Sequence, residues 1–228
     1  MSDTSTTISE VRLFLDKLRR DLPEIFSGSQ AKQDKLPFPK KALYMGALRD
    51  VRVEEVPDVI GDVVVEGESF VVRIGDRKRV SPATCLDSWM RLSAEAIIST
   101  RTRELAAVMG VEVSRIAVKD QKSLWGSCSV KKNVNFSWRL IKAPPSVLDY
   151  LIVHELAHLV HMDHSDEFWA VVEKHCPDYK NQRKWLRQHR DELMKDIEDD
   201  SIETTVQTPE APQPAPEAAA APAEDSQD

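Results

Sequence analysis

The sequence contains little cysteine, and none of it follows a recognisable pairing pattern. Its three cysteines, Cys85, Cys128 and Cys176, are far apart, and no C-x-x-C pair occurs. This spacing argues against a disulfide framework and a zinc ribbon, and it fits a reducing compartment. No apolar run approaches the roughly eighteen residues of a membrane span, and the first ten residues lack the basic and apolar regions of a signal peptide. We therefore expect a cytoplasmic protein with no membrane partner.

A concentrated basic region is also missing. The formal net charge is −7, but ten of the 38 acidic residues lie in 196–228, where there is no Lys or Arg. The rest of the chain has 31 basic and 28 acidic residues and is nearly neutral. Because dedicated nucleic-acid-binding proteins usually carry a basic face, the charge does not support a nucleic-acid partner.

The length of 228 residues allows one domain with extensions. Residues 1–62 are expected to form an N-terminal extension, with a short helix opened by a capping box at Thr7–Glu10 and then a linker. Residues 63–198 form the expected domain. Residues 199–228, rich in Ala, Pro and acidic residues, are expected to be a disordered tail. The N-terminal helix or the tail could contact a protein partner.

The expected domain mixes strands and helices, which predicts the α+β class. Valine-rich segments on either side of Gly67 predict a β-hairpin, and Leu86–Met109 has the apolar spacing of a long helix that ends at Gly110. In 134–140 apolar residues alternate strictly, which predicts a strand with Asn135, Ser137 and Arg139 facing outward. Shorter strands are expected at 115–120 and 123–129. After Pro145, Ser146 is expected to cap the next helix.

That next helix carries the pattern H-E-x-x-H, at His154, Glu155 and His158. Histidines four residues apart lie on one helical face, so both imidazoles can reach a single ion. Glu155 lies beside them and can deprotonate a water molecule. Zinc suits such a site, because catalytic zinc takes three protein ligands and leaves one position open.

The pattern alone also occurs by chance, but its surroundings favour a metal site. The helix is apolar on a wide face, and buried histidine and glutamate need partners. The best candidate for the third ligand is His164, which precedes the expected cap of the following helix. His161 and Glu173 are the other candidates for further ligands.

A series of motifs in the same order resembles the YgjP-like family of zinc metallopeptidases, relatives of the SprT-like proteases. The motifs span roughly Asp87–Arg190 and are KSLWGSC at 122–128, FSWRL at 136–140, DY before HELAH, DHS at 163–165 and FW at 168–169. The resemblance implies a small zincin-like domain, a short mixed sheet packed on helices around the HExxH helix. It also implies one zinc ion per chain held by His154, His158 and His164, Glu155 as the catalytic glutamate, and a polypeptide substrate. Asp163 stands where the family usually has asparagine.

Residues that bind the substrate are expected beside the helix that carries H-E-x-x-H. The stretch Trp125, Gly126 and Ser127 is the candidate strand edge for an extended peptide, with Gly126 permitting close backbone approach. The alternative is that Trp125 is a core aromatic residue. Tyr150 lies one turn before His154, where its hydroxyl can act near the metal or simply pack.

We therefore predict a zinc metalloendopeptidase in which Glu155 is the general base. Two alternatives are a zinc-stabilised protein-binding module without proteolysis, and a SprT-like protease that acts on proteins bound to nucleic acid.

Overall fold

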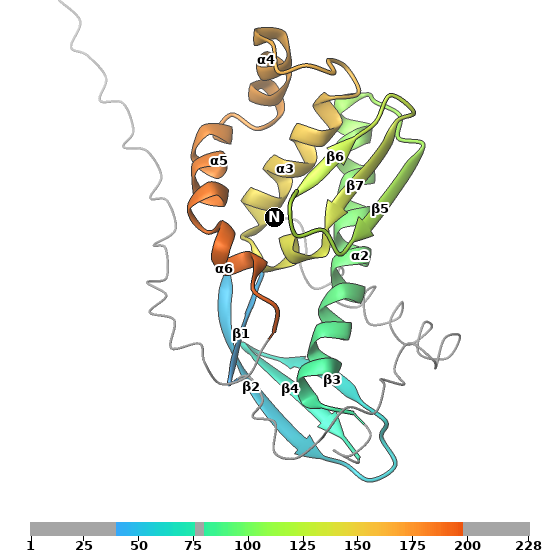
Figure 1. The fold of residues 1–228 in the computed structure, drawn as a ribbon, viewed down its shortest axis with the longest axis vertical. Coiled ribbons are helices and arrows are strands. Elements are labelled where there is room, and N and C mark those ends of the chain that lie inside the picture. Colours follow the sequence, from blue (N-terminus) through green and yellow to red (C-terminus); the bar gives the residue numbers. More distant parts are fainter. Residues whose placement is uncertain (1–39, 76–79, 198–228) are drawn as a thin grey trace, which may run out of the picture.

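The computed structural model describes residues 40–75 and 80–197, and in this part the chain forms two small sheets packed on helices (Figure 1). The predicted α+β class is confirmed. The expected N-terminal helix and the expected tail lie outside the described residues, so they stay predictions. No helix of the described ranges has both the length and the apolar character needed to cross a bilayer.

The first sheet has four strands in the spatial order β1-β2-β4-β3. Its interior strand β4 pairs with β3 on one side and β2 on the other, and its Phe70 and Val72 side chains are completely buried. The predicted hairpin is confirmed, with β3 and β4 antiparallel around Gly67, whose φ of 57° suits glycine. The sheet joins residues on both sides of the boundary expected at residue 62, since β2 pairs in parallel with β4. The strands are β1 (Lys41–Tyr44), β2 (Ala47–Glu55), β3 (Asp62–Glu66) and β4 (Ser69–Ile74).

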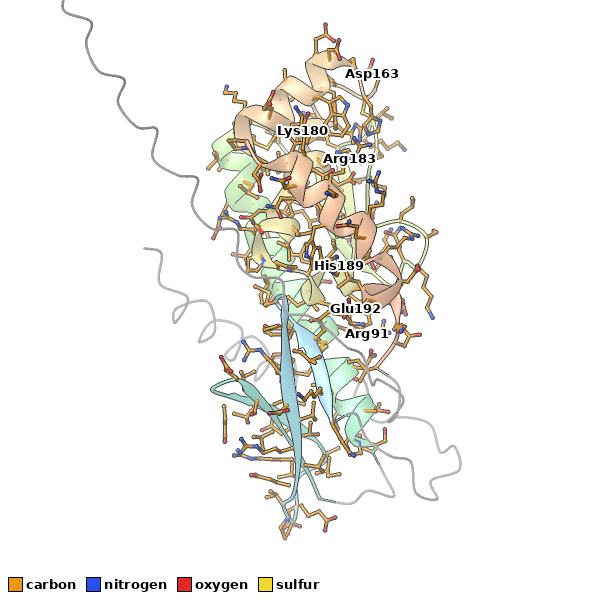
Figure 2. The ribbon with its side chains drawn as sticks, turned by 90° about the vertical axis from the view of Figure 1, so that its left-hand side faces the viewer. Arg91, Asp163, Lys180, Arg183, His189 and Glu192 are labelled. Atoms are coloured by element: carbon orange, nitrogen blue, oxygen red, sulfur yellow. The ribbon has the colours of Figure 1, made fainter. Side chains whose placement is uncertain are left out.

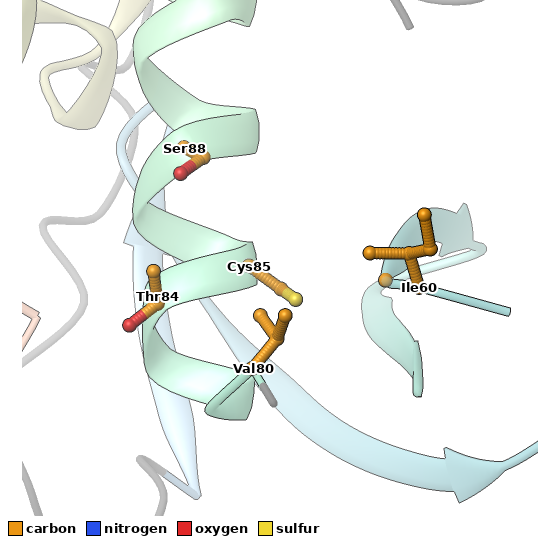
Figure 3. Close-up of a pocket in the computed structure, with 6 residues that line it drawn as sticks. Ile60, Val80, Thr84, Cys85 and Ser88 are labelled. Atoms are coloured by element: carbon orange, nitrogen blue, oxygen red, sulfur yellow. The ribbon is translucent and has the colours of Figure 1, made fainter. Parts of the chain in front are cut away.

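One long helix, α2 (Pro82–Met109), packs against both sheets and runs most of the length of the molecule (Figure 1). It starts four residues before the predicted Leu86, because the Ser81 hydroxyl accepts the Thr84 amide at 3.1 Å and Pro82 suits the first turn. It ends at Gly110, in the left-handed conformation with φ 68°, as predicted. A small pocket at its N-terminal end, beside the first sheet, is lined by Ile60, Gly61, Val80, Thr84, Cys85 and Ser88 (Figure 3).

The second sheet has the order β5-β7-β6, so β6 is an edge strand. The middle strand β7 is parallel to β5 and antiparallel to β6. The strands are β5 (Arg115–Lys119), β6 (Gly126–Cys128) and β7 (Asn133–Ser137).

The strand predicted to reach Leu140 ends at Ser137, and a 3-10 helix, η2 (Trp138–Lys142), follows it. The predicted outward orientation of Ser137 and Arg139 is wrong, because both are completely buried. The change from strand to 3-10 helix at Trp138 turns the Arg139 guanidinium inward, where it binds the carboxylates of Asp120 and Asp196. A buried guanidinium needs such partners.

The helix that carries H-E-x-x-H, α3 (Pro145–Ala157), is apolar and largely buried, as predicted. Ser146 does not cap it. Pro144 takes the capping position, and the Ser146 hydroxyl donates to the Gln182 side chain at 3.2 Å. Three helices follow, namely α4 (Asp166–His175), α5 (Tyr179–Gln188) and α6 (Arg190–Met194). Of these, α4 and α5 pack against α3, and α6 packs against η2 and α5 (Figure 1).

Candidate metal centre

The structure brings the three predicted ligands together. His154 lies in the last turn of α3, His158 follows the end of that helix, and His164 lies in the loop before α4. One ring nitrogen from each lies within 4.8 Å of the other two. The helix ends at Ala157, whose carbonyl accepts the amides of Val160 and His161. This turn takes the chain out of the helix and lets His164 face back towards it.

The separation of two ring nitrogens in the cluster matches the value expected at a tetrahedral metal site. The Nε2 atoms of His154 and His164 are 3.3 Å apart. Two nitrogens on a tetrahedral zinc ion, at ordinary Zn–N bond lengths, are separated by about 3.3 Å. The ring centroids of His158 and His164 are 4.8 Å apart. Burial, reinforced by the other two histidines, lowers the pKa of His154 to about 3, so its imidazole stays neutral, the form that binds metals.

Hydrogen bonds and packing orient the three rings. The Nδ1 atom of His158 lies 3.2 Å from the carbonyl oxygen of His161, so this nitrogen can carry the proton and leave Nε2 for an ion. Phe168 packs against all three imidazoles, with centroid distances of 4.5 to 5.0 Å. In the sequence, Phe168 was evident only as part of the FW motif. Its contact with the rings depends on how α4 docks, which helical spacing does not reveal.

Asp163 shapes the turn around His164. It lies near the end of the molecule that carries the histidine cluster (Figure 2). Its carboxylate accepts the Ser165 hydroxyl at 2.7 Å and the Ser165 amide at 3.3 Å. The departure from asparagine at this position therefore affects the turn, where either residue is suitable.

No fourth histidine, cysteine or carboxylate of the described chain joins this cluster. His161 contributes its carbonyl to His158 rather than its ring. Glu173 is exposed on α4 and is not part of the group. Three nitrogen donors with an open position is the donor set of a catalytic zinc site rather than of a closed structural one.

Glu155 is buried on α3, with 4% of its surface exposed. Burial raises the pKa of its carboxyl group to about 8. The backbone of Gly126 in β6 packs directly against this carboxyl group, because a Cβ atom at position 126 would lie 2.6 Å from Oε1. From the sequence, Gly126 was expected to let a substrate approach the backbone closely. In the structure, the side chain that lies close to the Gly126 backbone is that of Glu155.

The other predicted site residues surround this point. Trp125 directly precedes β6, and its carbonyl accepts the Ser137 amide at 2.8 Å. The Ser127 hydroxyl accepts the Asn135 side chain at 3.1 Å. Tyr150 is buried, with its ring centroid 6.1 Å from that of His154. Burial raises the pKa of Tyr150 to about 12, so its hydroxyl remains a hydrogen-bond donor.

Trp169 and Arg183 complete the side of the cluster formed by α4 and α5. The Trp169 ring lies 5.7 Å from the His154 ring and 5.8 Å from the His164 ring. The Arg183 guanidinium lies 4.8 Å from the centroid of Trp169 (Figure 2). The sequence did not indicate Arg183, because its contact with Trp169 depends on how α5 docks beside α3.

A family model and two solved structures are similar to this chain. The model of the YgjP-like family, metallopeptidase domain, matches residues 8–189. Similar solved structures include the metallopeptidase zymogen abylysin of Pyrococcus abyssi, with 18% identity over 40% of this chain and 93% of that chain and a TM-score of 0.35. Another is the metallopeptidase zymogen jannalysin of Methanocaldococcus jannaschii, with 21% identity over 40% of this chain and 95% of that chain and a TM-score of 0.34. No curated protein matches the chain. Because the family model spans most of the chain and includes the histidine cluster, the chain belongs to the YgjP-like metallopeptidase family.

Proposed function

We propose that the protein is a zinc-dependent endopeptidase in which His154, His158 and His164 hold the ion and Glu155 is the general base. The observation that carries the proposal is the convergence of three ring nitrogens within 4.8 Å beside a buried glutamate. Zinc is the metal that this donor set suits, at one ion per chain. A cytoplasmic location, supported by the three free cysteines, stays a prediction.

When bound, zinc would supply a Lewis acid that polarises the scissile carbonyl and lowers the pKa of a water molecule. Glu155 would accept a proton from that water at its carboxylate and later transfer it to the leaving amine nitrogen. Burial raises the pKa of this carboxyl group above its ordinary value, which makes it a stronger proton acceptor than an exposed carboxylate. The Tyr150 hydroxyl would donate a hydrogen bond to the substrate beside His154.

The edge strand β6 would bind the substrate. In the described sheet it pairs only with β7, so its other edge can pair with an extended peptide through main-chain hydrogen bonds. This edge lies beside α3, because Gly126 contacts Glu155 (Figure 1). Trp125 and Ser127, on either side of Gly126, would contact the peptide. Peptide pairing at this edge would place a scissile bond next to the general base.

The Gly126→Ala variant is expected to lose about tenfold in kcat/KM. The added methyl group would lie 2.6 Å from Glu155 Oε1, so either the strand or the carboxylate must shift. Misplacement of a catalytic group by about 1 Å is costly in rate. Val130→Ala, in the exposed turn after β6, is the matched control and should retain full activity. Full activity of Gly126→Ala would show that the close contact does not position Glu155.

The test of the proposed function is hydrolysis of casein and of a peptide library by purified, zinc-loaded protein. We expect turnover that a chelator abolishes and that zinc restores, with one zinc ion per chain by elemental analysis. Zinc bound at this stoichiometry without turnover of any polypeptide would contradict the proposal and favour the zinc-stabilised binding module.

A further inference from the structure

The loop from Asp120 to Trp125 leads into the proposed substrate edge without forming a helix or strand of its own. Its position therefore depends on contacts from other parts of the chain. From the end of β7, the Ser137 hydroxyl donates to the Gln121 carbonyl and the Ser137 amide donates to the Trp125 carbonyl, both at 2.8 Å. These contacts tie the loop to the end of β7.

Arg91 of α2 and Arg139 of η2 bind the Asp120 carboxylate at the start of the loop. Other contacts to the loop come from residues 190–196. The Arg190 guanidinium donates to the Ser123 carbonyl at 2.8 Å and to the Lys122 carbonyl at 3.4 Å, and it lies 6.0 Å from the Trp125 ring. The Asp196 carboxylate binds the Lys122 ammonium at 2.7 Å. Two charged side chains of this segment thus contact three residues of the loop, Lys122, Ser123 and Trp125.

The segment 190–196 is itself anchored to η2. Asp196 also binds the buried guanidinium of Arg139, which holds Asp120 at the start of the loop. The Lys142 ammonium donates to the Leu193 carbonyl at 3.2 Å and to the Lys195 carbonyl. Burial lowers the pKa of Lys142 to about 8, which reflects how completely this anchor is enclosed. The loop is therefore held between η2 on one side and residues 190–196 on the other.

We infer that Arg190 and Asp196 are positioning residues that hold the 120–125 loop, and through it the β6 edge, against Glu155. The inference rests on the proposed function, in which β6 binds the peptide. Because β6 is only three residues long and Gly126 contacts the Glu155 carboxyl group, a small movement of the loop would displace the peptide from the general base. Both residues lie beyond residue 189, where the match to the family model ends.

The test compares Arg190→Gln and Asp196→Asn with Arg187→Gln in the full-length, zinc-loaded protein. Arg187 is an exposed residue of α5 without an ion pair to any residue in 40–75 or 80–197, and its variant is the control. In both positioning variants we expect amide hydrogen exchange in 120–128 to accelerate about tenfold while α3 is unchanged. The KM for an extended peptide should rise about tenfold, with zinc content unchanged and kcat altered less. Arg190→Lys keeps the charge and one donor and should recover part of the loss.

Two results would overturn the inference. One is unchanged exchange in 120–128. The other is faster exchange throughout the protein with an unchanged KM at temperatures well below unfolding, which would identify a purely stabilising role. If the wild type hydrolyses no peptide, the proposed function fails, while the exchange comparison still decides whether Arg190 and Asp196 hold the loop.

Discussion

Replacing Glu155 with glutamine is expected to reduce peptide hydrolysis by about a hundredfold to ten-thousandfold, the usual contribution of a positioned general base. Glutamine keeps the size and shape of the side chain but cannot accept the proton from water. The close contact with Gly126 should survive, because the two side chains occupy the same volume. The measurement is kcat/KM on the same peptide for wild type and variant, each with its zinc content determined.

Stability separates this role from a structural one. Because the carboxyl group is buried and its pKa is raised, a neutral amide at this position should not lower the melting temperature. Glu173→Gln, on the exposed face of α4 and outside the histidine cluster, is the control for removing one negative charge. A Glu155→Gln variant with normal turnover but lower stability or less bound zinc would refute the general-base assignment and leave the metal site standing.

The His164→Ala variant is expected to bind zinc at least about a hundredfold more weakly than the wild type. Losing an outer partner of a metal ligand already costs tenfold to a hundredfold in affinity, and a direct ligand should cost no less. In this structure the His164 Nε2 atom is 3.3 Å from that of His154, so the alanine removes one of three converging donors. Competition with a chelator of known zinc affinity measures the difference.

His161→Ala is the matched control for this variant. It removes a neighbouring imidazole but keeps the backbone carbonyl that faces His158 Nδ1. Its zinc affinity should therefore stay close to that of the wild type. If His161→Ala lost zinc and His164→Ala retained it, the ligand assignment would have to be exchanged.

Patterns of neighbouring residues predicted the helices and strands whose formation depends on nearby residues in the sequence. The apolar spacing and the terminal Gly110 were enough to predict α2, and the H-E-x-x-H spacing was enough to place His154 and His158 on one face. Arg139 was predicted wrongly because alternation in a strand says nothing about a change to a 3-10 helix at Trp138. One of its partners, Asp196, is 57 residues away in sequence. No local pattern reports such a pairing.

The surroundings of the candidate site show the same limit. Gly126 was predicted to matter because glycine permits close approach, but the approaching group, Glu155, became evident only from the packing of β6 on α3. The contacts of Phe168 and Arg183 around the histidines depend on the docking of α4 and α5. Sequence motifs thus predicted the candidate ligands and the candidate base more completely than the side chains that pack around them.

Because α2 packs against both sheets, it also determines how the molecule unfolds. Its first half covers the first sheet and its second half contacts the sheet and helix that carry the candidate site. A second connection is made where the amides of Met45 and Gly46 donate to the carbonyls of Ile141 and Lys142. Both sheets pack against α2. Separation of either sheet from this helix would therefore expose apolar surface on the sheet and on α2. Heat should therefore release a bound ion and melt the remote first sheet in the same cooperative event.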